Sequence, residues 1–216
     1  MVNGSGLPVP GYCAGGPTGT PFPEVWLHHP YAGGGSQLAD ALSVLASTPN
    51  VNPITLNIGS NDVLQFLASK CGFPATDTCT EAQVLAEYEH ITSNVSGILT
   101  QLRAAAPKAQ IVLIGAYNPY PTVVPGGDKL TAFFASLLAK AAAKVPNTSF
   151  ANNLPVFNPS GTFGGPESGD IPTICAFTAM CPGGTFNPAS PEADIHPTKL
   201  GYAVFAGVVA ADWLTH

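Results

Sequence analysis

The sequence has few charged residues, and cationic ones are the scarcest. Its 216 residues include 7 lysines and arginines against 13 aspartates and glutamates, which gives a formal net charge of -6 at pH 7. A protein that follows a nucleic acid backbone needs clustered basic side chains to neutralise the phosphates. Because the chain cannot supply such a cluster, we expect no nucleic acid partner.

Long apolar runs are also missing. The longest stretch, residues 203–214, is interrupted only by Asp212 and is shorter than the roughly 20 residues that cross a bilayer. We therefore expect no transmembrane segment and predict that this stretch is a buried core helix. The first residues show no basic region followed by an apolar one, so we expect any export signal to be absent or already removed.

The spacings that bind metals are absent as well. The five cysteines are Cys13, Cys71, Cys79, Cys175 and Cys181, with no Cys-x-x-Cys among them and no histidine at zinc-finger distance. Zinc is the rival interpretation, but we predict no metal and no cofactor. The last four cysteines form two close pairs, as short-range disulfides do in an oxidising compartment, which favours a secreted protein. Cys13 is left without a mate.

Glycine and proline are abundant, with 23 and 22 residues. They dominate residues 1–35, which we interpret as a loop-rich segment before an ordered α/β core at 36–216, all within a single domain spanning 1–216. A second Gly/Pro-rich stretch, residues 155–191, is interpreted as a loop at the rim of an active site, closed by Cys175 and Cys181.

Apolar periodicity predicts alternating helices and strands. Ser36, the Thr80 and Gln83 capping box, and Asp128 are each expected to cap a helix. The predicted helices cover residues 36–46, a stretch after Asp62, 80–105, a stretch from Asp128, and the chain after Thr198. The predicted strands cover 54–58, 110–115 and 149–151. This order generates a parallel sheet with right-handed crossovers, so we predict a three-layer α/β/α sandwich with a flavodoxin-like sheet.

Two polar motifs fall where loops converge at the carboxyl ends of such strands, which is where open parallel sheets bind ligands. The first, residues 59–62 (Gly-Ser-Asn-Asp), follows the strand at 54–58, and the second, residues 194–198 (Asp-Ile-His-Pro-Thr), leads into the last helix. Each alone has a plain structural explanation, since Gly and Asn are common in turns and Asp62 could cap a helix. Their combination favours a catalytic site.

Together the two motifs resemble the third and fifth sequence blocks of the SGNH, or GDSL-type, serine ester hydrolases, and the similarity extends from about His29 to the C-terminus. The resemblance implies the SGNH hydrolase fold and a secreted lipase or esterase that acts by serine acylation on a small-molecule, lipid or polysaccharide ester. It also implies that His196 is the general base and that Asn61 donates to the oxyanion. Gly59 would allow the chain to turn sharply at the end of the strand that precedes Asn61. Acyl transfer requires such a base and such fixed donors.

The acidic residue that would accompany His196 departs from the family pattern. It usually stands three residues before the histidine, a position that Ala193 occupies here, whereas Asp194 stands two before it. Side chains two apart in an extended chain point to the same side. We therefore expect Asp194 to orient the imidazole of His196, with a backbone carbonyl as the alternative.

The nucleophile is the larger departure, because no Gly-Asp-Ser occurs in the sequence. Of the serines next to glycine before the third block, Ser5 and Ser36, neither follows a strand pattern. We expect the chain to begin after the first strands of the family fold, which would leave the strand at 54–58 with an unpaired edge. One alternative is an inactive remnant or interaction module, and another is a carbohydrate-binding domain with Trp26, Trp213 and loop tyrosines as stacking platforms. Because Trp213 belongs to an apolar helix, we expect it in the core instead.

Overall fold

The computed structural model of the protein describes residues 36–72, 78–190 and 192–215. The predictions about residues 1–35, including those about Ser5, Cys13 and Trp26, lie outside the described residues. In chain order the elements are α1 (Gln37–Ser47), β1 (Ile54–Leu56), α2 (Ser60–Lys70), α3 (Glu81–Ala105), β2 (Ile111–Ile114), α4 (Gly127–Ala143), β3 (Thr148–Ala151), α5 (Leu154–Phe157), α6 (Pro159–Thr162), the 3-10 helix η4 (Glu167–Asp170), α7 (Ile171–Phe177), β4 (Thr178–Ala179), the 3-10 turn η5 (Pro182–Gly184), β5 (Asp194–Pro197) and α8 (Lys199–Thr215).

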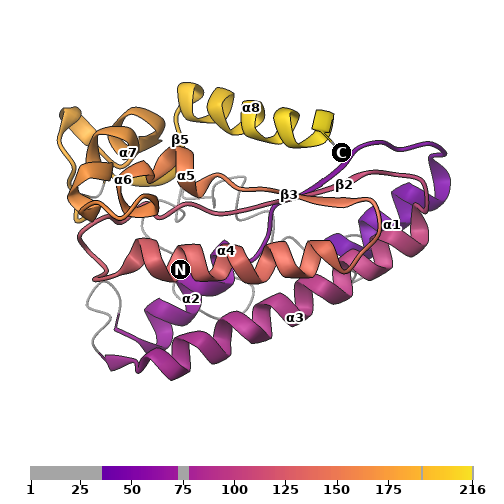
Figure 1. Cartoon of the computed structure of the whole chain (residues 1–216), viewed down its shortest axis with the longest axis horizontal. Helices are drawn as coiled ribbons and strands as arrows, with labels where there is room; N and C mark the ends of the chain where they lie inside the picture. The colour runs from indigo at the N-terminus through magenta and orange to yellow at the C-terminus, as the bar shows by residue number, and fades with distance from the viewer. Residues whose placement is uncertain (1–35, 73–77, 191, 216) are drawn as a thin grey trace, which may run out of the picture.

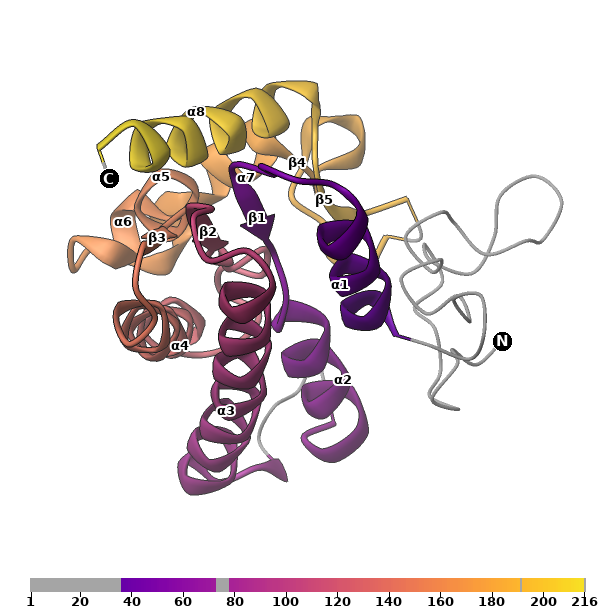
Figure 2. The same cartoon turned by 90° about the vertical axis from the view of Figure 1, so that its right-hand side faces the viewer.

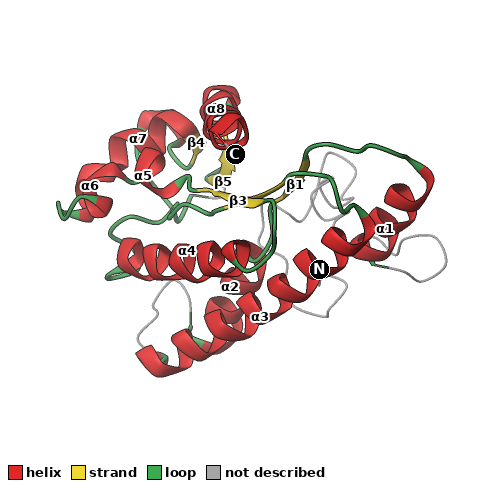
Figure 3. Cartoon of the chain, turned by 45° about the vertical axis from the view of Figure 1, so that its right-hand side comes forward, coloured by secondary structure: helices red, strands yellow, loops and turns green. Residues whose placement is uncertain are grey.

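Three parallel strands form the main sheet in the order β1-β2-β3. All four residues of the central strand β2 are buried, which suits a continuous apolar run covered on both faces. The predicted parallel sheet is confirmed, although β1 ends at Leu56 rather than at Ile58. Figure 3 shows the strands as a thin yellow layer among helices.

The alternation of side chains along β2 divides the core in two. Ile111 and Leu113 pack in one cluster with α3 and α4, whereas Val112 and Ile114 pack on the opposite face against apolar side chains of α8. Figure 2 shows α8 on one side of the strands and α3 and α4 on the other. The three-layer α/β/α arrangement is therefore confirmed.

Two predicted helix caps are present. The Ser36 hydroxyl accepts a hydrogen bond from the Ala39 N–H at 3.2 Å. Thr80 and Gln83 form a reciprocal capping box, in which each side chain accepts from the other residue's backbone N–H. These side chains satisfy backbone donors that the first turn of a helix leaves unpaired, so both helices begin where the sequence indicated.

The other two helix starts differ from the prediction. Gly126, at φ 72°, occupies the position before α4, and Asp128 lies inside the first turn with its side chain buried. Asp128 is therefore not the cap, and its carboxyl group instead accepts a hydrogen bond from the side-chain amide of Asn118. Helix α2 begins at Ser60 rather than after Asp62, so Asp62 is an exposed first-turn residue and not a cap.

Helix α8 is not the buried core helix that its apolar sequence predicted. Only Gly201 of this helix is buried, while Leu214 is 78% exposed and Trp213 is 38% exposed. The prediction that Trp213 lies in the core is wrong for the same reason, because only one face of α8 packs on β2 and β3. Within the described parts of the chain, no helix combines the length and apolar content needed to cross a membrane.

The Gly/Pro-rich stretch at 155–191 is largely helical rather than a loop, and it contains α6, η4, α7, β4, η5 and most of α5. Three of its prolines, Pro155, Pro159 and Pro172, stand in the first two positions of α5, α6 and α7, where the N–H that proline lacks would have no partner within the helix. The predicted disulfides Cys71–Cys79 and Cys175–Cys181 are both formed. Figure 1 shows α5, α6, α7 and β5 gathered at one end of the sheet.

Candidate active site

The turn after β1 requires a glycine. Gly59 has φ 98°, in the left-handed region, and passes directly into α2. A Cβ at this position would lie 3.1 Å from the Phe134 ring and 3.2 Å from an Ile91 methyl carbon. Both the backbone angle and the close core contacts therefore favour glycine.

Asn61 lies on the first turn of α2, with its side chain exposed. The first turn of a helix carries backbone N–H groups without intrahelical partners and the positive end of the helix dipole. This setting suits a side-chain amide that is to donate to a negatively charged oxygen.

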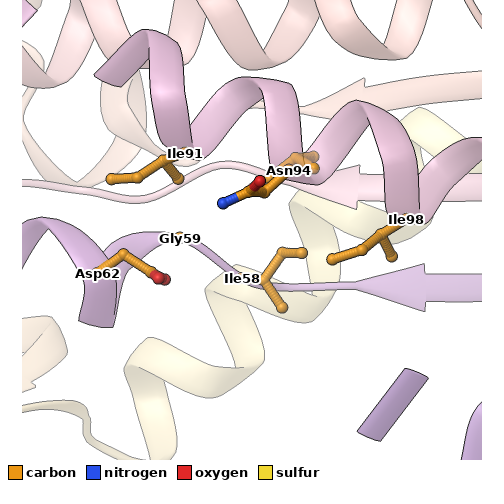
Figure 4. Close-up of a pocket in the computed structure, with 7 residues that line it drawn as sticks. Ile58, Gly59, Asp62, Ile91, Asn94 and Ile98 are labelled. Carbon is orange, nitrogen blue, oxygen red and sulfur yellow. The ribbon is translucent and has the colours of Figure 1, made fainter. Parts of the chain in front are cut away.

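A small cavity of about 190 Å³ lies beside this turn, between the end of β1 and helix α3. Figure 4 shows its walls, which are mostly aliphatic with two polar side chains. The lining residues are Ile58, Gly59, Asp62, Ile91, Asn94, Val95 and Ile98. The cavity thus adjoins the predicted oxyanion turn, while neither Asn61 nor His196 is among the residues that line it.

The second motif forms strand β5, which pairs antiparallel with the short strand β4. Asp194 and His196 meet across the extended backbone: Asp194 Oδ1 lies 2.5 Å from His196 Nδ1 and accepts the His196 backbone N–H at 2.9 Å. The two side chains are 34% and 33% exposed. The structure therefore brings together the two residues that the motif suggested as acid and base.

Two opposing effects act on the Asp194 carboxyl. Burial raises its pKa, but the hydrogen bonds from the His196 ring and backbone, together with the charge of that ring, outweigh burial and lower the pKa below its usual range. Asp194 is thus ionised at neutral pH and can only accept a hydrogen bond. The proton between them consequently resides on Nδ1 of His196, so that Nε2 is the basic nitrogen whenever the imidazole is neutral.

A tyrosine that the sequence did not single out also reaches this strand. The Tyr117 hydroxyl, from the loop after β2, donates a hydrogen bond to the Ile195 carbonyl oxygen. The Tyr117 ring stacks on Phe157 with centroids 4.2 Å apart and planes 14° apart. The only signal in the sequence was its position just past the carboxyl end of a strand.

Buried asparagines join the loop after β2 to the helical segment beyond β3. The Asn118 N–H donates to Asn158 Oδ1, and Asn158 Nδ2 donates to the Asn118 carbonyl, both at 3.0 Å. Asn118 Nδ2 also donates to Asp128 Oδ1 at 2.8 Å. Because both asparagines are almost wholly buried, these bonds are shielded from water and hold the two segments in register.

Two buried carboxyl groups complete this network. Asp128 and Asp170 are 2% and 0% exposed, and Asp170 accepts two backbone N–H groups of α6. The pKa of Asp128 is raised to about 7, chiefly by burial and also by Asp170 and Glu167, while the hydrogen bond from the Asn118 amide acts in the opposite direction. Among the described residues, no three His, Cys, Asp or Glu side chains are grouped so as to hold a metal ion.

Comparison with known proteins identifies the family. The GDSL-like lipase/acylhydrolase family matches residues 21–204. Solved structures that resemble the chain include an extracellular lipase from Streptomyces rimosus, with a TM-score of 0.53 and 15% identity over 81% of this chain and 76% of that one. They also include phospholipase A1 from Streptomyces albidoflavus, with a TM-score of 0.50 and 18% identity over 81% of this chain and 75% of that one. No curated protein matches the chain. At these identities the structures show a shared fold, and the family match shows more: the chain belongs to the GDSL-like lipase/acylhydrolase family.

Proposed function

We propose that the protein is a secreted carboxylic-ester hydrolase in which His196 is the general base and Asp194 is the acid that orients it. The observation that carries the proposal is the contact between Asp194 Oδ1 and His196 Nδ1 at 2.5 Å. An ionised Asp194 carboxylate that accepts a hydrogen bond from Nδ1 holds the His196 imidazole in the tautomer whose Nε2 can accept a proton. The same carboxylate stabilises the imidazolium that then forms. Base and orienting acid are the two groups that activate a serine hydroxyl for attack on an ester.

Asn61 is proposed as the side-chain donor to the oxyanion of the tetrahedral intermediate. Its exposed position on the first turn of α2 supports this role, because the helix dipole favours negative charge at that end. The left-handed backbone of Gly59 sets the direction in which the turn leaves the strand. A single oxyanion donor contributes about 10²–10³ in kcat, or about 3–4 kcal/mol.

The proposed substrate is an ester with an apolar acyl group, such as a lipid ester; small-molecule and polysaccharide esters are the other classes that the sequence suggested. The aliphatic cavity next to Gly59 supports an acyl group, since it adjoins the proposed oxyanion turn. A lipase and a phospholipase A1 are among the solved structures that share the fold, which is in keeping with a lipid ester. Two disulfides support secretion, because they persist in oxidising compartments.

Hydrolysis of a chromogenic short-chain ester by the full chain tests the proposal. His196→Ala should lower kcat/KM at least about a hundredfold, and Asn61→Ala should lower kcat by about the same factor. His90→Ala is the matched control, because His90 is an exposed histidine on α3 whose ring lies 3.4 Å from the side-chain amide of Asn94 in the same helix. Equal hydrolysis by His196→Ala and the wild type would refute the assignment of the base.

The missing Gly-Asp-Ser supports a second candidate, a chain that keeps the fold without catalysing hydrolysis. Ser36 does not serve as an obvious replacement, since its hydroxyl caps α1. A fluorophosphonate probe separates the two candidates, because it reacts only with an activated serine. Labelling, followed by mass spectrometric mapping of the labelled residue, would support the hydrolase and identify its nucleophile, whereas a chain that neither labels nor hydrolyses ester would support the inactive alternative.

A further inference from the structure

Strand β5, which carries the proposed acid and base, has few contacts within its own sheet. It is four residues long, and among the residues that the structure describes it pairs only with the two-residue strand β4, with a register irregularity between Thr178 and Ala179. A strand paired over so short a length is weakly restrained. The positions of Asp194 and His196 therefore depend on contacts from outside this two-stranded sheet.

Tyr117 provides such a contact at the residue between the two. Its hydroxyl donates to the carbonyl oxygen of Ile195, which separates Asp194 from His196 along β5. The Ile195 carbonyl belongs to the peptide that leads into His196. A hydrogen bond to that oxygen therefore restrains the backbone from which both side chains extend.

The aromatic ring of Tyr117 is itself held from behind. It stacks on Phe157, which is fully buried. Phe157 in turn makes edge contacts with Phe177, at 5.3 Å, and Phe205, at 6.2 Å. The ring thus rests on a cluster contributed by α5, α7 and α8, and such aromatic contacts favour one orientation.

The backbone of Tyr117 is fixed on both sides. Two residues before it, the Gly115 carbonyl accepts the Asn153 amide at 3.1 Å. On its other side, Asn118 exchanges two hydrogen bonds of 3.0 Å with Asn158. Tyr117 is therefore held firmly in place, and it connects the loop that follows the main sheet to β5.

We propose that Tyr117 is a positioning residue that holds the Asp194–His196 pair in register through the Ile195 carbonyl. The inference rests on the proposed function of His196 as general base. Tyr117 acts through the backbone of β5 and is given no direct role in the reaction. Catalytic side chains must be held within about 0.5 Å of the productive geometry, and a displacement of about 1 Å can cost a hundredfold in rate.

The Tyr117 hydroxyl keeps its proton, and so remains a hydrogen-bond donor, over the pH range of ester hydrolysis. Burial raises the pKa of Tyr117 well above that of a free tyrosine, and the charges of Tyr202, Asp194 and Tyr120 raise it further. The hydrogen bond to Ile195 is consequently kept at any pH at which the imidazole can act as a base.

The test compares Tyr117→Phe, which keeps the stacked ring and removes the hydroxyl, with Tyr88→Phe. Tyr88 is a buried tyrosine of α3 in the core on the other side of the sheet, so its variant controls for the general effect of losing a buried hydroxyl. We expect Tyr117→Phe to lower kcat about tenfold with KM nearly unchanged. In an NMR titration, its His196 ring signals should move to a midpoint about half a pH unit lower, because the looser strand weakens the contact with Asp194.

The two measurements separate the inference from the function on which it rests. A wild-type titration midpoint in Tyr117→Phe, or a shift equal to that in Tyr88→Phe, overturns the positioning role whatever the kinetics. A lowered midpoint in a chain without His196-dependent hydrolysis supports the restraint by Tyr117 and overturns only the proposed function. Should Tyr117→Phe fail to fold, Phe157→Leu removes the ring on which Tyr117 stacks and should also lower the His196 titration midpoint. An unchanged His196 midpoint in Phe157→Leu overturns the positioning role of Tyr117.

Discussion

Replacing Asp128 by asparagine should change how the stability of the protein depends on pH. The protonated Asp128 carboxyl and an asparagine amide have nearly the same shape, and both are neutral, although the carboxyl has one hydrogen to donate and the amide has two. Oδ1 would continue to accept from Asn118, and the amide nitrogen would take the place of Oδ2, which is buried and accepts no hydrogen bond from the described residues. The variant therefore mimics the protonated state of this site at every pH.

The expected magnitude follows from the raised pKa. Burial, together with Asp170 and Glu167, moves the pKa of Asp128 from 3.8 to about 7. The folded state thus holds the proton more tightly than the unfolded chain does. The stability that this group contributes is fully present below about pH 4 and is lost as the pH rises to about 7. Each unit of pKa corresponds to about 1.4 kcal/mol, so the total loss approaches about 4 kcal/mol.

Urea unfolding of wild type and Asp128→Asn between pH 4 and pH 8 measures this difference. We expect the two free energies of unfolding to be similar at pH 4, with the variant becoming more stable by up to about 4 kcal/mol at pH 8. Asp40→Asn, at an exposed aspartate of α1, is the matched control and should not show this divergence. A difference between wild type and Asp128→Asn that stays constant, or that favours wild type as the pH rises, would refute the buried protonated carboxyl.

Three further substitutions test the packing. Gly201→Ala should destabilise the fold by about 3 kcal/mol or more, because the new Cβ would lie 1.9 Å from the Phe177 carbonyl oxygen. Gly207→Ala on the same helix meets no atom within 4 Å and should stabilise the fold by about 1 kcal/mol, so thermal melts of the two variants should shift in opposite directions. Gly59→Ala should cost at least about 1–2 kcal/mol in urea unfolding, since φ is +98°, while Gly97→Ala in α3 meets no atom and should not destabilise. Arg103→Lys should cost about 1–3 kcal/mol, because the guanidinium donates to four carbonyl oxygens that one ammonium cannot all reach; an unchanged unfolding midpoint would contradict this.

Local chemistry made several features readable before any coordinates. The capping box at Thr80 and the Ser36 cap are satisfied by atoms three residues away, and the two disulfides join cysteines only eight and six residues apart. The apolar run of β2 required cover on both faces. The contact of Asp194 with His196 was also accessible, because two residues of extended chain bring side chains to one side.

Helix α8 shows where such local reasoning fails. Its composition indicates apolar character but carries no information about how much sheet lies beneath it. Only one face meets β2 and β3, so residues such as Trp213 remain partly exposed. Proline content likewise suggested a loop at 155–191, because it does not distinguish the start of a helix, where proline is tolerated, from a true break.

By itself the sequence determined the order of the three main strands and of helices α1 to α4 and α8, the turn at Gly59 and the pairing of Asp194 with His196, since each depends on residues close together along the chain. Only the tertiary structure decided that Asp128 is a buried carboxyl rather than a helix cap, and that Tyr117 reaches the Ile195 carbonyl 78 residues away. Burial and long-range contact arise from how whole elements pack on one another. No local pattern of residue types records that packing.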